Sequence, residues 1–316
     1  GVWIMAYTTI DNPELYFQVK LYTGTGSTLS VTLDGDENMQ PDMVWLKCRS
    51  LVKNHYLFDS VRGATKNLAP NDTDVEGTDA NTLTSFNSDG FTVGSSGAVN
   101  TSSSTNVGWS WKAGTTSGIT TDGNTTITPS AYSFSQDAGI SILKHTGNGT
   151  SGAKMAHGLG AVPHMIIIKN TLTANEWVVY HHKNTAAPET DGLVLNTTAA
   201  TADDAAYWND TAPDSVNMTF GNSGATNDST GGSNVYISFS FTAKQGYSKF
   251  GSYVGNGNAD GAFVYTGFRP AWIIIKRSSS TENWAIVDDQ RDGYNVDNDQ
   301  LLNTTAAEIT NDRMDI

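Results

Sequence analysis

The sequence predicts an all-β protein made of tandem antiparallel β-sandwich domains of jelly-roll type. The chain has 31 glycines and 8 prolines but only 16% charged residues, and Asn, Ser and Thr fill much of the remainder. This composition favours short strands joined by turns, because Asn, Ser and Thr compete with the helical backbone for hydrogen bonds. No segment has a sustained helical apolar period. One block of sequence also occurs three times, which indicates repeated domains.

Each copy of the repeated block has a proline as its second residue, followed by a continuous apolar run that ends at a lysine. The copies read QPDMVWLKCRS from Gln40, VPHMIIIKN from Val162 and RPAWIIIKR from Arg269. At one constant distance after the lysine comes a ring-bearing residue, and further on an asparagine. The lysines are Lys47, Lys169 and Lys276, the ring residues His55, Trp177 and Trp284, and the asparagines Asn71, Asn196 and Asn303. A short continuous apolar run predicts a strand buried on both faces.

A Gly-x-Gly precedes each block, as in LYTGTGS, KHTGNGT and SYVGNGN. It predicts a tight turn, since the third glycine and the lysine of a phosphate loop are missing. The first two copies close with NVGWSWKA and NVYISFSFTA, in which aromatic residues alternate with serine. This period of two predicts strands with one core-facing side. The third copy has no such ending before Ile316, so we expect it to be incomplete.

These patterns divide the chain into five predicted parts. They are an N-terminal arm (1–13), repeat 1 (14–112), a polar linker (113–136), repeat 2 (137–246) and an incomplete repeat 3 (247–316). We expect tandem domains of this kind to extend the protein as a stiff series.

The charge and the hydropathy exclude several classes of partner. The net charge of −14 argues against nucleic acid, whose phosphates need a basic surface, and against an anionic membrane face. No stretch approaches the roughly 18 consecutive apolar residues of a membrane span, so we expect no membrane insertion. The lone Cys48 cannot form an intrachain disulfide.

The carboxylates form no catalytic pattern. Retaining glycosidases need two carboxyl groups about 5 Å apart, whereas the glutamates of this sequence are isolated and mostly lie in predicted turns. The Gly-x-Ser-x-Gly elbow of esterases is also missing. The sequence therefore predicts that the protein is not an enzyme and has no catalytic residues.

The sequence does not decide whether the protein binds a metal ion. Neighbouring residues on a strand point to opposite faces, so His181 and His182 are predicted to be a surface pair and not a chelating site. Three acidic clusters, at 34–38, 71–74 and 292–300, offer oxygen ligands suited to Ca²⁺. Acidic turns of this kind also occur without an ion, so no cofactor is assigned and calcium is kept as an alternative.

Two further patterns concern side-chain pairs and aromatic residues. An Asp-x-x-Arg spacing occurs at Asp59–Arg62 and at Asp288–Arg291, and predicts a structural ion pair. Repeat 2 carries His181 and Asn184 at these positions. The spacing of Trp177 and Trp284 favours core packing. Two aromatic residues in a polar loop are better exposed candidates for ligand contact, namely Tyr207 and Trp208.

The motifs together resemble the repeat-bearing structural proteins of tailed bacteriophages, especially marine ones. The resemblance is carried by MAYTTIDNPELYFQ, QPDMVWLKCRS with FDSVRG, SFNSDGFTVGS with GWSWKAG, and GYSKFGSYVGNG with GFRPAWIIIKR. It spans nearly all of Met5 to Ile316. The units are also similar to concanavalin-type jelly rolls through their strand pattern.

This resemblance implies a virion structural protein, made in the host cytoplasm, that serves as a tail fibre or similar appendage. It implies other virion proteins and a host-surface glycan or protein as partners, with loops presented for host attachment. A homo-oligomer, a trimer by analogy, is expected. The alternatives are a carbohydrate-binding, lectin-like module and a capsid decoration protein.

Overall fold

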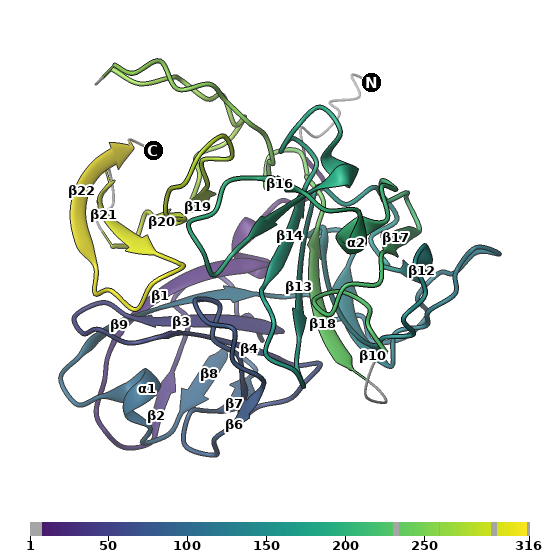
Figure 1. Cartoon of the computed structure of the whole chain (residues 1–316). Coiled ribbons are helices and arrows are strands. Elements are labelled where there is room, and N and C mark those ends of the chain that lie inside the picture. Colours follow the sequence, from purple (N-terminus) through teal and green to yellow (C-terminus); the bar gives the residue numbers. More distant parts are fainter. Residues whose placement is uncertain (1–7, 230–233, 259, 292–295, 315–316) are drawn as a thin grey trace, which may run out of the picture.

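The structure is a computed structural model of the whole chain and describes residues 8–229, 234–258, 260–291 and 296–314 (Figure 1). Strands make up 35% of the chain and helices 5%, and the sheets are antiparallel, which confirms the predicted all-β class. Two predicted features lie partly outside the described residues: the first seven residues of the N-terminal arm, and 292–295 of the third acidic cluster.

Repeat 1 is a two-layer β-sandwich (Figure 1). The main sheet has the order β1 (Phe17–Thr23), β9 (Thr105–Trp111), β3 (Met43–Cys48), β4 (His55–Asp59). The small sheet has the order β2 (Leu29–Val31), β8 (Gly90–Val93), β7 (Leu83–Asn87). The remaining elements are η1 (Pro13–Leu15), β5 (Lys66–Asn67), β6 (Gly77–Thr78) and α1 (Gly97–Asn100). Apolar side chains of both sheets, such as Phe58 and Phe91, form a buried cluster between the layers.

Repeat 2 has the same central strand order. Its main sheet runs β10 (Ala131–Ser135), β11 (Ile140–Thr146), β18 (Val235–Phe241), β13 (Met165–Asn170), β14 (Val178–His181), β15 (Asp191–Val194), β16 (Ala202–Asp203). Its second layer comprises β12 (Ala153–Ala156), β17 (Asn217–Phe220), η2 (Pro188–Thr190) and α2 (Ala205–Trp208). The order β11–β18–β13–β14 matches β1–β9–β3–β4. Strand β10 lies inside the segment predicted to be a polar linker and pairs with β11 along its whole length.

Repeat 3 contributes one sheet in the described residues. Its order is β19 (Trp272–Ile275), β20 (Ala285–Asp288), β21 (Val296–Leu301), β22 (Ile309–Met314). By their spacing from the proline and the lysine, β19 and β20 correspond to β3 and β4. The described part of repeat 3 has no second layer.

The apolar runs at the start of the repeats are buried on both faces, as predicted. Every residue of β3 and of β13 is buried. Because side chains alternate along a strand, β3 sends Val44 and Leu46 into the cluster of repeat 1, and Met43 and Trp45 into a second cluster.

That second cluster, which we call the shared core, is built by all three repeats. Leu57, Val179 and Ile286 occupy the same position in their repeats, and all three are buried in it. In Figure 1 repeat 1 lies at the lower left, repeat 2 at the right and repeat 3 at the upper left, around this centre. The repeats therefore do not form the extended series expected from the sequence. They pack around one apolar core, whose burial contributes about 25 cal/mol per Å².

Candidate functional site

The lysine that ends each repeated apolar run crosses to a neighbouring repeat. Each ammonium group donates to the main-chain carbonyl that lies two residues beyond the repeated asparagine of that neighbour. These contacts are Lys47 Nζ to Thr305 O (3.3 Å), Lys169 Nζ to Thr73 O (2.8 Å) and Lys276 Nζ to Thr198 O (3.2 Å). Burial lowers the pKa of Lys47 and that of Lys169 to about 8. Repeat 1 thus binds repeat 3, repeat 3 binds repeat 2, and repeat 2 binds repeat 1.

The ring-bearing residue after each lysine makes a second contact in the same cyclic direction. Its acceptor is the carbonyl two residues before the neighbour's repeated asparagine. The contacts are Trp177 Nε1 to Ala69 O (3.1 Å), Trp284 Nε1 to Val194 O (3.0 Å) and His55 Nε2 with Leu301 O (3.3 Å). Trp177 and Trp284 are 0% and 3% exposed, which confirms their predicted core packing.

The repeated asparagine shapes the turn that offers these carbonyls. In each repeat its Oδ1 accepts from the main-chain N–H of the ring-bearing residue, at 2.8 Å from His55 and 2.9 Å from Trp177 and Trp284. At each junction a hydrogen bond between main-chain atoms also joins the neighbouring repeats. These bonds are Glu76 N to Thr171 O, Thr201 N to Ser278 O and Glu308 N to Arg49 O. The three repeats therefore close a ring with pseudo-threefold symmetry.

The two predicted ion pairs are present and buried. Arg62 Nε lies 2.5 Å from Asp59 Oδ2, and Arg291 Nε lies 2.6 Å from Asp288 Oδ2. All four side chains are at most 1% exposed. A guanidinium beside each carboxylate offsets the large cost of burying an isolated charge.

Repeat 2 has a neutral hydrogen bond at the place where repeats 1 and 3 have a contact between arginine and glutamate. In repeats 1 and 3 the arginine also reaches a glutamate, at 3.5 Å for Arg62 to Glu76 and 3.1 Å for Arg291 to Glu308. At the corresponding positions of repeat 2, Thr201 Oγ1 donates to Asn184 Oδ1 over 2.6 Å. The same loop is therefore held without charge.

Glu308 joins repeat 3 to repeat 1. Its carboxylate accepts two hydrogen bonds from Arg49, both 2.8 Å long, in addition to the contact with Arg291. Burial raises the pKa of Glu308, but Arg49 and Arg291 outweigh it and the net pKa is lowered. Bidentate pairing of this kind is strong and directional.

The two predicted ligand-contact residues lie differently from expectation. Trp208 is 2% exposed and packs between the layers of repeat 2, so the expectation that it is exposed is wrong. Its helix α2 is capped by Asp204, whose Oδ1 accepts from Ala206 N at 2.9 Å, and this places Trp208 inward. Tyr207 is half-buried, and its ring covers Gly192.

The histidine pair is half-buried and has a third imidazole beside it. His182 lies 4.3 Å from His164 between ring centroids, and both contact Phe250 or its main chain. Burial, with His182 and His164 nearby, lowers the pKa of His181 to about 4. Across 8–229, 234–258, 260–291 and 296–314, no group of three or more His, Cys, Asp or Glu is arranged to hold a metal ion.

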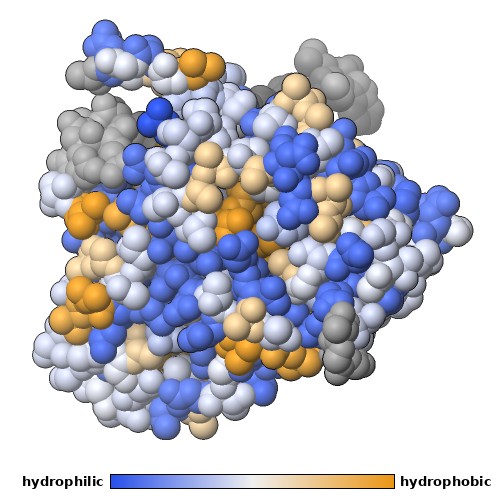
Figure 2. Space-filling view, in the orientation of Figure 1, coloured by the Kyte–Doolittle hydropathy of each residue, from blue (hydrophilic) through white to orange (hydrophobic). Residues whose placement is uncertain are grey.

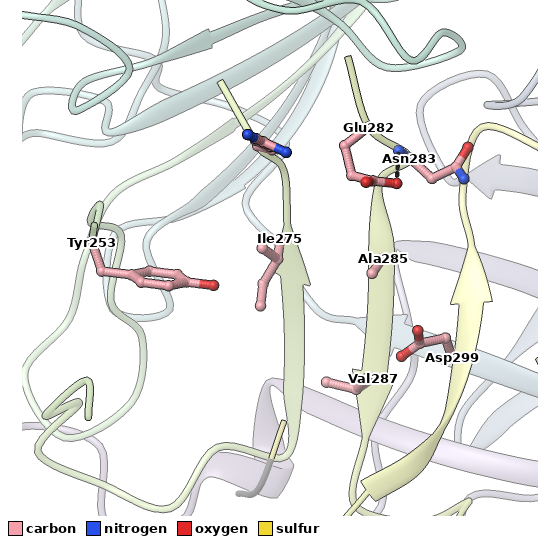
Figure 3. A pocket seen from close by; sticks show the side chains of 8 residues that line it. Tyr253, Ile275, Glu282, Asn283, Ala285, Val287 and Asp299 are labelled. Carbon is pink, nitrogen blue, oxygen red and sulfur yellow. Dashed lines mark hydrogen bonds between the residues drawn. The ribbon is translucent and has the colours of Figure 1, made fainter. Parts of the chain in front are cut away.

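Repeat 3 carries a cavity where the other repeats carry a second layer (Figure 3). Val287, on the floor of the cavity, corresponds to Phe58 and Tyr180, which pack against the second layers of repeats 1 and 2. The cavity has a volume of about 300 Å³ and is lined by Tyr253, Ile275, Arg277, Glu282, Asn283, Ala285, Val287 and Asp299. Tyr253 faces it from the opposite side (Figure 3).

A family model described as a domain of unknown function (DUF7483) matches residues 12–316, and thus spans all three repeats. The chain belongs to this family. No curated protein and no solved structure matches this DUF7483 chain. Among the described residues, no helix is long and apolar enough to cross a membrane.

Proposed function

We propose that this DUF7483 chain is a non-enzymatic structural protein of a bacteriophage virion, located in a tail fibre or similar appendage. The observation that carries the proposal is the use of the repeated polar residues. Each repeated lysine and ring nitrogen binds a main-chain carbonyl of another repeat. The most regular polar features of the chain thus maintain architecture, which supports a structural role and agrees with the phage resemblance.

The proposed unit is a closed group of three repeats, not a rod of separate domains. The rigid shared core would hold the outer loops in fixed positions, while those loops vary without disturbing the sheets. The exposed positions of such loops include Leu51 and Val52, which are 38% and 69% exposed, whereas Arg49 and Lys53 of the same loop bond to repeat 3 and stay fixed. Loops of this kind are the proposed contacts with a host-surface glycan or protein. Other virion proteins are the proposed partners of the remaining surface.

Immunogold electron microscopy tests this proposal. Antibodies raised against the folded chain are applied to purified particles of a phage that encodes the sequence, with pre-adsorbed antibody as the control. We expect labels on the tail or its appendages. Labels spread over the head with the capsid lattice would favour a decoration protein instead. Particles that carry no label, together with free protein in the lysate, would contradict a virion role.

A further inference from the structure

One of the three junctions between repeats carries a titratable ring where the other two carry an indole. His55 meets Leu301 O of repeat 3 through Nε2 at 3.3 Å, whereas Trp177 and Trp284 donate to their carbonyls through Nε1. An indole N–H stays a donor at every ordinary pH, but an imidazole takes up a proton near pH 6.5. The ring residue can therefore make the junction of repeats 1 and 3 respond to acid, and it cannot do so at the other two.

The hydrogen bonds of His55 hold its ring in one neutral form. Trp45 Nε1 can only donate, and it donates to His55 Nδ1 over 3.1 Å. Nδ1 is therefore the acceptor, and Nε2 carries the proton that is donated to Leu301 O. An imidazolium has an N–H on both nitrogens, so a proton added at Nδ1 faces the N–H of Trp45. Protonation thus breaks the bond to Trp45.

The surroundings of the ring also disfavour a positive charge. His55 is 0% exposed, and the cations Lys47 of β3 and Arg291 of repeat 3 lie near it. Burial, together with Lys47 and Arg291, lowers the pKa of His55 well below its usual value, against the opposing effect of the bond to Leu301 O. Proton uptake at His55 therefore adds a buried positive charge beside two others.

The carboxylates on the elements around His55 are engaged with other groups. Trp109, whose ring is stacked on that of His55 at 6.5 Å between centroids, donates through Nε1 to Asp288 at 3.0 Å. A positive charge on His55 has to compete with arginines for these carboxylates. The carboxylates and the groups they meet are Asp59 with Arg62, Asp288 with Arg291, Glu308 with Arg49 and Arg291, and Asp299 in the wall of the repeat 3 cavity.

The rim of this junction lies at the surface. The turn between β21 and β22 lies beside the loop after β3 at the left of Figure 1, and Figure 2 shows hydrophobic residues at the surface on this side of the molecule. Two main-chain bonds cross the junction there, from Lys53 N to Thr305 O (2.9 Å) and from Glu308 N to Arg49 O (2.8 Å). The exchange of these two amide protons with solvent therefore reports whether the junction is closed.

We propose that the junction of repeats 1 and 3 is an acid-sensitive switch that opens when His55 takes up a proton. The junction of repeats 1 and 2, which has Trp177 in the same place, stays closed. In the open form the ring is solvated and has its ordinary pKa of about 6.5. The open form then binds the proton before the closed form does, so the closed junction is favoured above about pH 6.5 and weakens as the pH falls below it. This inference goes beyond the proposed virion role and does not depend on it.

Hydrogen exchange read at single amides of the 316-residue chain tests the proposal. The amides of Lys53 and Glu308 report the junction of repeats 1 and 3, and that of Glu76, which donates to Thr171 O, reports the junction of repeats 1 and 2. Each exchange rate is divided by the intrinsic rate of an unstructured chain at the same pH. Between pH 7 and pH 5 we expect the protection of Lys53 and Glu308 to fall about 20-fold relative to that of Glu76.

His55→Gln is the matched variant. The glutamine amide can accept from Trp45 and donate to Leu301 O, but it takes up no proton in this pH range. In this variant the selective loss of protection between pH 7 and pH 5 should disappear. Nitrogen-15 NMR of the unaltered protein adds a measurement that needs no variant, since at pH 7 the ring of His55 should carry a proton at Nε2 only.

Three results would overturn the proposal. The first is that Lys53 and Glu308 lose no more protection than Glu76 in the unaltered protein. The second is that His55→Gln shows the same selective loss, which would assign the response to Glu308 and its arginines. The third is that at pH 7 the imidazole of His55 carries a proton on both nitrogens or on Nδ1 alone.

Discussion

Replacing Arg291 with methionine should destabilise the protein strongly, because it leaves a carboxylate without its guanidinium in the core. The Arg291 and Asp288 side chains are both 0% exposed, and the guanidinium also donates to Ile286 O at 2.9 Å and contacts Glu308. Removing one member of a buried ion pair costs about 3–5 kcal/mol. Urea denaturation at pH 7, followed by tryptophan fluorescence, measures this loss as a change in the free energy of unfolding.

Repeat 2 provides the matched control. Asn184 occupies the position of Arg291, and Asn184→Leu removes only the neutral hydrogen bond to Thr201, at a cost of about 1 kcal/mol. The double variant Asp288→Asn/Arg291→Met should recover part of the loss, since no uncompensated charge remains. If Arg291→Met and Asn184→Leu cost the same within about 1 kcal/mol, the electrostatic reasoning is refuted.

Two further predictions concern repeat 2. Trp208→Ala should cost about 3–5 kcal/mol in the same urea assay, because the side chain is 2% exposed, and a loss below about 1 kcal/mol would contradict its burial. Burial lowers the pKa of His145 to about 3, while its ring stacks between Phe220 and Tyr236. The unfolded chain then binds the proton first, so this stability is present above about pH 6.5 and is lost as the pH falls toward 3. The free energy of unfolding should drop by about 2 kcal/mol from this group between pH 6.5 and pH 5, and His145→Phe should reduce that drop. An unchanged pH dependence in His145→Phe would contradict it.

The two-faced burial of the repeated strands could be predicted from the sequence. A strand such as β13 must be apolar at consecutive positions when both of its faces are covered, and MIIIK shows this directly. The ion pairs could also be predicted, because the Asp-x-x-Arg spacing brings together two side chains of opposite charge. Local composition was sufficient in these cases.

The ring of repeats could not be predicted in the same way. Its donors, such as Lys169 and Trp177, are visible in the sequence, but their acceptors are main-chain carbonyls, which every residue has. The constant spacing of lysine and ring residue, followed in each copy by an asparagine, was the available signal. It indicated which residues are special but not which repeat each of them contacts.

Two other differences depend on tertiary packing. Trp208 stands in a polar stretch, yet a one-turn helix directs it inward, and composition alone does not report that direction. Strand β10 was missed because its surroundings are rich in Thr and Gly, although AYSFS has the same alternation as the closing strands.

Differential scanning calorimetry of the 316-residue chain tests the central claim most directly. If the three repeats close around one shared core, they should unfold together, in a single transition whose calorimetric and van't Hoff enthalpies agree. Two or three separable transitions, each assignable to one repeat, would show that the repeats fold independently and would contradict the shared core.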